Sequence, residues 1–103
     1  MANTYTNAKV DLTTTGITTL YTAASLTTGI IKSILVSEDT GNADTFTLTV
    51  TNGSDVYSLF KTKAIGANAT VELLTAPLVL QPTEILKVTA ATANRLHVVA
   101  SIL

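Results

Sequence analysis

Threonines and large apolar residues alternate without interruption in the segment TFTLTVT, residues 45–51. Successive side chains of an extended strand point to opposite faces, so Phe46, Leu48 and Val50 would share one face and the threonines the other. The next two residues, Asn52-Gly53, tolerate the positive φ angles of a type I′ turn and give the strongest short hairpin signal. We therefore predict a strand with one packed and one polar face, followed by an antiparallel return strand.

The rest of the chain has the composition of β-structure. Threonine, valine, isoleucine and leucine dominate it, and β-branched side chains fit well on a pleated sheet. Clusters of glycine, proline, asparagine and aspartate separate the apolar runs, and no run has a helical period of useful length. Strands are predicted at residues 9–14, 17–22, 30–37, 45–51, 56–62, 70–75, 84–90 and 95–103.

This number and spacing of strands predicts the fold class. About eight short strands are typical of an all-β, antiparallel two-sheet sandwich, and we predict a jelly-roll-like arrangement, with a partly closed barrel as the alternative. We expect residues 1–8 to form an N-terminal arm and residues 9–103 a single β-sandwich domain. A chain of this length hides somewhat more than about 60% of the surface of its unfolded form, which is enough for a real core.

Two segments carry apolar side chains in both strand phases. In IIKSILV, residues 30–36, one phase has Ile30, Ile34 and Val36 and the other has Ile31 and Leu35. This pattern predicts a central strand that is covered on both sides. The last strand, RLHVVASIL, directs one phase inward and still carries Val99 and Leu103 in the other. Either a loop of the same chain or a partner subunit would cover these two residues.

Charge is scarce in this chain. Charged residues make up 13% of the sequence and the formal net charge is −1, whereas typical soluble domains have about 25% charged residues. Copies of such a chain repel one another weakly, so the composition favours an oligomer or a coat component. The low pI, about 5.6, gives no basic field for a phosphate backbone, and Lys61-Thr62-Lys63 alone cannot supply one. We expect no nucleic-acid partner.

Neither export nor membrane insertion is expected. The first residues, MANTYTNAKVD, lack the basic region and apolar core of a secretory signal. Residues 12–29 contain no charge, but threonine and serine make up about half of them, and a transmembrane helix needs about twenty predominantly apolar residues. We therefore predict no membrane anchor.

No set of residues predicts catalysis. His97 is the only histidine and cysteine is absent, which excludes a histidine pair on a metal and a thiol nucleophile. The turn aspartates Asp39, Asp44 and Asp55 do not have the ligand spacing of a calcium loop. We predict no catalytic residue, no metal and no cofactor.

A carbohydrate-binding sandwich module is the alternative from another functional class, because sugar-binding domains share this fold. Their sites favour exposed aromatic side chains. This chain has no tryptophan, its aromatic content is 5%, and Tyr5, Tyr21 and Tyr57 lie in three different segments. The sequence thus has few aromatic side chains that could stack against a sugar ring.

Four segments follow one another in a distinctive order. They are LYT at residues 20–22, IIKSILVSEDTG from Ile30, ELLTAPLVLQPTEILKVTA from Glu72 and ANRLHVVASIL from Ala93. Together they resemble small β-sandwich virion proteins of tailed bacteriophages, over most of the chain from about Ile17 to the C-terminus. The resemblance implies a non-enzymatic structural subunit of the virion, assembled in the host cytoplasm, whose partners are copies of itself and the major capsid protein or other neck and tail proteins.

A capsid decoration, or cement, protein is the first interpretation, and a neck or tail-associated subunit is the alternative. A decoration protein would stabilise the head by burying apolar and hydroxyl-rich surface against neighbouring subunits. Covering uncharged threonines has a lower desolvation cost than covering ions, so part of the threonine-rich stretch is expected to contact another subunit. The predicted subunit interface consists of Tyr5, Thr13, Thr18, Tyr21, Thr22, Val99 and Leu103.

Overall fold

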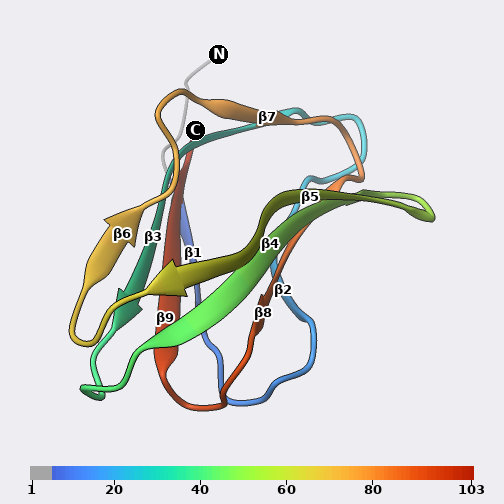
Figure 1. The fold of residues 1–103 in the computed structure, drawn as a ribbon. Coiled ribbons are helices and arrows are strands. Elements are labelled where there is room, and N and C mark those ends of the chain that lie inside the picture. Colours follow the sequence, from blue (N-terminus) through green and yellow to red (C-terminus); the bar gives the residue numbers. More distant parts are fainter. Residues whose placement is uncertain (1–5) are drawn as a thin grey trace.

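Two antiparallel sheets face each other in the structure, a computed structural model that describes residues 6–103 (Figure 1). The five-stranded sheet has the order β1 (Thr6–Asp11), β9 (Leu96–Ile102), β3 (Gly29–Glu38) and β6 (Thr70–Glu72), with β7 (Leu78–Leu80) also paired to β3. The four-stranded sheet has the order β2 (Thr18–Thr22), β8 (Ile85–Ala90), β4 (Asp44–Asn52) and β5 (Asp55–Ile65). Residues 6–103 contain no helix that is long and apolar enough to cross a bilayer.

This strand order is that of a jelly roll. The C-terminal strand β9 lies between β1 and β3 in one sheet, and β8 lies between β2 and β4 in the other. The chain therefore returns from its far end to fill the centre of both sheets, which is how two Greek keys are nested in this fold. The predicted all-β, two-sheet, jelly-roll-like sandwich is confirmed.

The first strand begins earlier than its sequence pattern predicts. β1 starts at Thr6 because its first residues pair with the end of β9, Thr6 with Ile102 and Ala8 with Ala100. Residues 6–8 of the expected N-terminal arm are therefore part of the five-stranded sheet. Residues 1–5 of that arm lie outside the described residues.

The strand expected at residues 70–75 is shorter than predicted, and a further short strand, β7, follows beyond its expected end. β6 ends at Glu72, where the Glu72 carboxylate accepts the backbone N–H of Leu74 at 3.2 Å and turns the chain. β7 then resumes the pairing with β3 at Leu78. Three residues are too few to show a strand period, which is why β7 is absent from the predicted strands.

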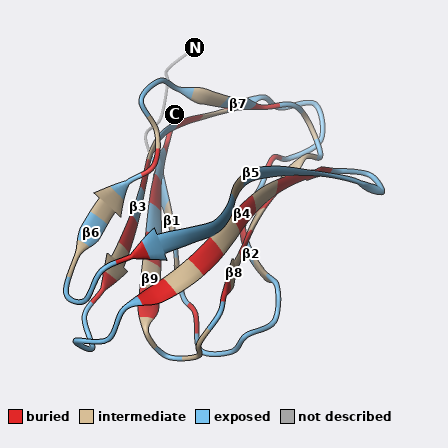
Figure 2. Ribbon diagram, in the orientation of Figure 1, coloured by how far each residue is buried: buried red, intermediate tan, exposed pale blue. Residues whose placement is uncertain are grey.

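The core lies between the two sheets and consists of one apolar phase of each long strand (Figure 2). Phe46, Leu48 and Val50 of β4 are buried as predicted, and the intervening threonines are half-buried on the outside of the sheet. Ile34 and Val98 belong to the same core from the opposite sheet. The alternation of apolar and polar residues along each strand thus gives each sheet a buried face and an exposed face.

One predicted alternation is wrong in β3. Ile31, Ile34 and Val36 share the core face, whereas the sequence pattern places Ile31 with Leu35. A register shift between Ile31 and Ser33 against β9 inserts an extra residue and moves the alternation by one position. Leu35 therefore points outward and is 40% exposed, so the described chain does not cover β3 on both sides.

The turn between β4 and β5 differs in type from the prediction. Asn52 pairs with Asp55, so the central residues are Gly53 and Ser54 rather than Asn52 and Gly53. Of the central pair only Gly53 has a positive φ, 61°. A positive φ at the first central position is typical of a type II′ turn, in which glycine is preferred at that position.

We expect Gly53→Ala to lower the free energy of unfolding by about 1 kcal/mol, because a Cβ is disfavoured at positive φ. Nothing lies within 4 Å of a Cβ built at this position, so the loss comes from the backbone alone. Urea denaturation measures it, with Ser54→Ala as the control. Equal stability of Gly53→Ala and the parent chain would mean that the turn has another geometry.

A buried carboxylate joins two loops at one end of the sandwich. Glu38, which is 2% exposed, accepts hydrogen bonds from the backbone N–H groups of Thr40, Gly41, Asn42 and Asn68, at 2.8 to 3.1 Å, and from the Thr40 hydroxyl. Burial raises the pKa of this carboxyl, but the hydrogen bonds outweigh it and lower the pKa to about 2. The β3–β4 and β5–β6 loops are therefore held together by one negative charge.

Because the folded pKa of Glu38 lies below the ordinary value of 4.5, its stabilisation is present above pH 4.5 and is lost as the pH falls toward about 2. We expect Glu38→Gln to lower the melting temperature at neutral pH and to flatten the decline in stability across this acid range. Thermal unfolding at several pH values tests both effects. A parallel acid decline in the parent chain and the variant would contradict this role.

Candidate functional site

The outward side chains of the five-stranded sheet form a surface that we call the β9 face. Its central row crosses four strands, because Lys9 pairs with Val99, Val99 with Leu35, and Leu35 with Glu72. Val99 is 37% exposed and Leu35 is 40% exposed. The row therefore has two apolar side chains in the middle, a positive charge at the β1 edge and a negative charge at the β6 edge.

The rows on either side of this central row have different side chains. On one side, Asn7, Ser101 and Ser33 are cross-strand partners, and beyond them Ile30 lies beside Val79 and Leu103. The backbone groups of Leu103 and Ile30 are joined by two hydrogen bonds, at 2.8 and 3.4 Å. The β9 face thus combines apolar and hydroxyl-bearing side chains, and Lys32 in the bulge of β3 is an exposed charge on the same central strand.

Two of the predicted interface residues, Val99 and Leu103, lie on this face. Leu103 is half-buried and follows β9 in the outward phase, one residue after the buried Ile102. Leu35, Ile30 and Val79 lie on the same face but are not in the predicted set. The segment IIKSILV has apolar residues in both strand phases, so it indicates that some of them, such as Ile30 or Leu35, point away from the core. It does not show which strands lie beside them.

The other predicted residues belong to a different surface. Thr18, Tyr21 and Thr22 are in β2, at an edge of the four-stranded sheet, and Thr13 is exposed in the β1–β2 connection. Tyr21 is half-buried, and its ring lies close to Gly29 at the start of β3, since a Cβ added at Gly29 would be 3.2 Å from it. Tyr5 lies outside the described residues. The predicted set therefore does not form one continuous interface.

Glu72 is held in place at the β6 edge of the β9 face. Its carboxylate accepts the hydroxyl of Ser33 and the backbone N–H groups of Ile34 at 2.9 Å and Leu74 at 3.2 Å. Burial raises the pKa of Glu72, but these hydrogen bonds outweigh it and lower the pKa below its ordinary value. The face therefore has a fixed negative charge at this edge at neutral pH.

His97 lies at one end of the face between two aspartates. Its Nδ1 is 2.5 Å from Asp11 Oδ1, and its Nε2 is 3.2 Å from Asp39 Oδ1. Asp11 is its cross-strand partner in β1, and Asp39 belongs to the β3–β4 loop that Glu38 organises. The hydrogen bond that His97 Nδ1 donates to the Asp11 carboxylate raises the pKa of His97 most, partial burial opposes it, and the charge of Asp39 raises it further.

The His97 cluster has no geometry for catalysis or for a metal. Both ring nitrogens are occupied by carboxylates on opposite sides of the ring, so the imidazole has no free nitrogen to serve as a base or a ligand. Within residues 6–103 there is no group of three or more histidine, cysteine, aspartate or glutamate side chains that could hold a metal ion. The cluster instead joins β1, β9 and the β3–β4 loop.

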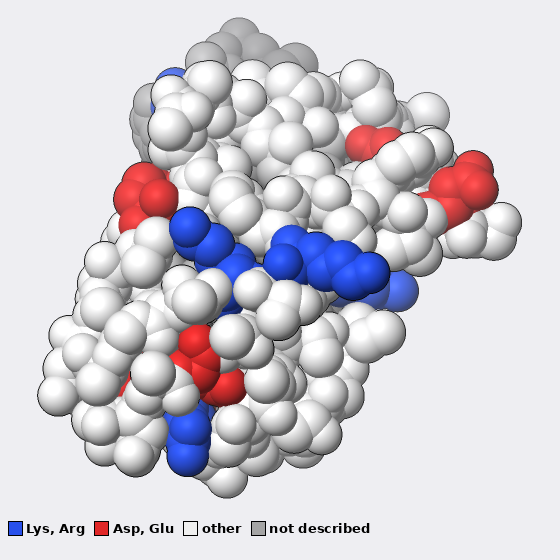
Figure 3. Space-filling view, in the orientation of Figure 1, with Lys and Arg blue, Asp and Glu red and all other residues white. Residues whose placement is uncertain are grey.

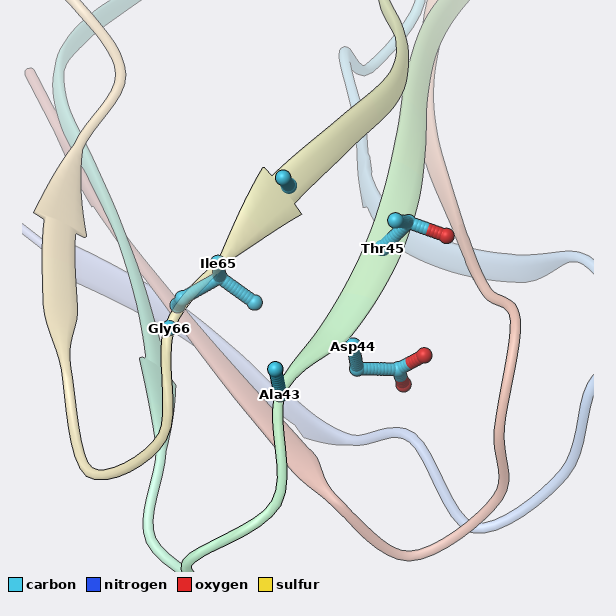
Figure 4. Close-up of a pocket in the computed structure, with 6 residues that line it drawn as sticks. Ala43, Asp44, Thr45, Ile65 and Gly66 are labelled. Carbon is cyan, nitrogen blue, oxygen red and sulfur yellow. The ribbon is translucent and has the colours of Figure 1, made fainter.

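A hollow of about 460 Å³ opens between the start of β4 and the end of β5, lined by Ala43, Asp44, Thr45, Ala64, Ile65 and Gly66 (Figure 4). Asp44 is its ionisable residue, and this buried carboxylate accepts the backbone N–H of Thr92 at 3.2 Å. Figure 4 shows its side chain directed away from Gly66 and Ala43. The hollow therefore lacks the convergent polar groups that orient a small ligand.

The edge strand β5 is an exposed surface of another kind. Nearly all of its residues are exposed, and long exposed edges can pair with strands of other chains. Two register shifts against β4 place bulges in β5, and at the second the N–H of Thr62 donates to Thr47 Oγ1 at 3.1 Å. Lys61 and Lys63 also lie on β5, and Figure 3 shows basic side chains along this part of the surface. Bulges and lysines both oppose edge-to-edge pairing.

Comparison with known proteins identifies no matching family model, no matching curated sequence and no matching solved structure.

The raised pKa of His97 gives a pH dependence with a defined sign. Its stabilisation is fully present below the ordinary value of 6.5 and is lost as the pH rises through the folded pKa. We expect NMR titration of this single histidine to give a midpoint above 6.5, and Asp11→Asn to lower the midpoint. Asp55→Asn at the distant hairpin serves as the control. A midpoint at or below 6.5 in the parent chain would contradict the geometry.

Proposed function

We propose that this chain is a non-enzymatic structural subunit of a tailed-bacteriophage particle and that it decorates the capsid. The observation that carries the proposal is the β9 face, where Leu35, Val79 and Val99 leave apolar surface exposed on a paired sheet. The order of sequence segments that resembles small virion β-sandwich proteins supports the same function. The scarcity of charge, 13% of the residues, favours close contact between subunits.

Decoration through such a face needs no bond to be made or broken. Paired strands lose little conformational freedom on binding, so more of the interaction free energy is retained in the complex. Ser37 and Ser101 on the same face can exchange water for hydrogen bonds to a partner, at a lower desolvation cost than ions. A stable contact of this kind buries at least about 1,000 Å² in total.

The arrangement of tyrosines favours this function over sugar binding. Tyr21 lies in β2 and Tyr57 in β5, and the strand order places these two strands at opposite edges of the four-stranded sheet. Tyr21 is also half-buried beside Gly29. The two rings therefore cannot form one stacking platform for a sugar.

Particles of the phage that encodes this chain, prepared without the protein, provide the test. We expect the purified chain to bind them saturably, with copies distributed over the icosahedral shell in a particle reconstruction. Val99→Arg in the β9 face should weaken binding at least about tenfold, because a charge would be buried without a partner.

The control is Lys87→Glu, which changes a charge on the four-stranded sheet and should bind like the parent chain. If the copies are confined to the portal vertex or tail, the chain is a neck or tail-associated subunit and not a decoration protein. Absence of binding to any part of the particle, together with specific binding in a glycan screen that Tyr57→Ala abolishes, would overturn the structural function.

A further inference from the structure

We infer that the β4–β5 hairpin packs against the same hairpin of a second copy, with the two β5 strands side by side and antiparallel about a two-fold axis near Ser58. Tyr57 of each copy then enters an apolar groove beside Phe60 of the other. This surface is the β5 edge of the four-stranded sheet, and it is separate from the β9 face that the proposed function gives to the capsid. The contact joins copies edge to edge and leaves the β9 face free.

The hairpin projects beyond the rest of the sandwich and exposes apolar side chains (Figure 1). Tyr57 pairs with the buried Val50, so its ring lies on the side of the sheet that faces the core. It is nevertheless 56% exposed, because the hairpin extends past the strands of the five-stranded sheet. Val56, on the other side of the strand, is 62% exposed. One short segment therefore leaves two large apolar side chains uncovered.

A groove of about 280 Å³ lies beside this segment. Leu59 and Phe60 of β5 form one wall, residues 73–78 form the other, and none of the described residues that line the groove is charged. The register shift against β4 leaves Leu59 without a partner and pairs Phe60 with Leu48, which brings Phe60 to the side of β5 where Tyr57 lies. A copy that approaches this edge can therefore place its own Tyr57 in the groove.

The charges of β5 select the antiparallel orientation. Rotation about an axis near Ser58 exchanges residues that are equally far from it, so Asp55 of each copy faces Lys61 of the other. These two residues are about 20 Å apart within one chain, at about 3.4 Å per residue, and cannot pair there. In the described part of the chain neither forms an ion pair. A parallel arrangement would oppose like charges, which disfavours an interface.

The lysines of the four-stranded sheet do not oppose one another across this axis. The two copies of Lys61 are about 20 Å apart, and Lys63 faces the uncharged turn residue Gly53 of the other copy. Lys87 lies in the row of Ser58 but two strands away. Because strands are about 4.8 Å apart, its two copies are more than about 20 Å apart. Charges in water are largely screened beyond about 8 Å at physiological ionic strength.

Side chains make this contact, since the bulges of β5 prevent a regular ladder between the two edges. Residues 55–61 span about 24 Å and the sheets are about 10 Å apart, which gives a strip of roughly 250 Å² in each copy. A total of about 500 Å² is below the roughly 1,000 Å² of a stable complex, so we expect a weak, reversible dimer. Copies held together on one capsid would strengthen it through their high effective concentration. Only this last step rests on the proposed function.

Disulfide cross-linking tests the geometry, because the chain has no cysteine of its own. Ser58→Cys places one thiol of each copy beside the axis, where opposite Cα atoms about 5 Å apart suit a disulfide. We expect mild oxidation to link this variant at least about tenfold faster than Ser101→Cys, because its two thiols are held together. Both serines are exposed, and Ser101 lies on the β9 face, which makes it the matched control.

Charge reversal in the Ser58→Cys background tests the orientation. Asp55→Lys opposes lysine to lysine at both ends of the contact and should slow cross-linking at least about fivefold. Adding Lys61→Asp restores opposite charges with their places exchanged and should restore the rate. Val99→Arg, which should weaken particle binding, should leave the rate unchanged. Failure of this inference and failure of the proposed function are thus distinguishable.

Sedimentation equilibrium of the parent chain gives a second measurement. The average mass should rise above 10.7 kDa as the concentration approaches about 1 mM. Tyr57→Ser should prevent this rise and keep the monomer's melting temperature, because the ring is exposed in one copy. A constant monomer mass, or a Ser58→Cys variant that oxidises no faster than Ser101→Cys, would overturn the inference and leave the hairpin to a different partner.

Discussion

The pairing of β3 with β9 is the interaction on which the rest of the structure depends. It joins residues 29–38 to the last strand of the chain, and β9 also holds β1 on its other side. The four-stranded sheet repeats the arrangement, with β8 between β2 and β4. Both sheets therefore close only when the C-terminal third of the chain has been placed. Such long-range pairing favours slow folding, because the entropy cost of closing a long loop comes before the stabilising contacts form.

The register of this pairing also creates the candidate interface. The shift between Ile31 and Ser33 moves Leu35 from the core phase to the outside, directly beside Val99. Without the shift the alternation of β3 would exchange core and surface residues, since strand faces have a period of two. One extra residue in a central strand thus decides which apolar side chains are left for a partner.

The acidic residues near this surface have structural tasks. Glu38 and Glu72 both accept several backbone N–H groups, and in each the hydrogen bonds lower the pKa of the carboxyl. Glu38 joins two loops, and Glu72 turns the chain between β6 and β7. Because both carboxylates accept hydrogen bonds from the chain's own backbone, they are held in place at the ends of the sheet and do not lie between Val99 and Leu35.

Local patterns were sufficient to predict much of this protein. The alternation in residues 45–51 predicts β4 and its buried face, and the turn clusters predict eight of the strands. The outward phase of the last strand also places Val99 and Leu103 on the side of the sheet away from the core, but it does not show whether a loop of the same chain covers them; in the structure Val99 is exposed and Leu103 is half-buried. Local patterns fail at the type II′ turn, at β7 and in the expected placement of Thr18, Tyr21 and Thr22 with those residues.

The sequence by itself determined the fold class, the strand positions and the low charge of the surface, because these follow from side-chain chemistry within a few residues. Only the tertiary structure decided which strands are neighbours, and hence that Lys9, Val99, Leu35 and Glu72 form one row. Strand order and register depend on the packing of segments far apart in the chain. A one-residue bulge changes which side chains of a strand are exposed, and the local sequence pattern does not show where the bulge lies.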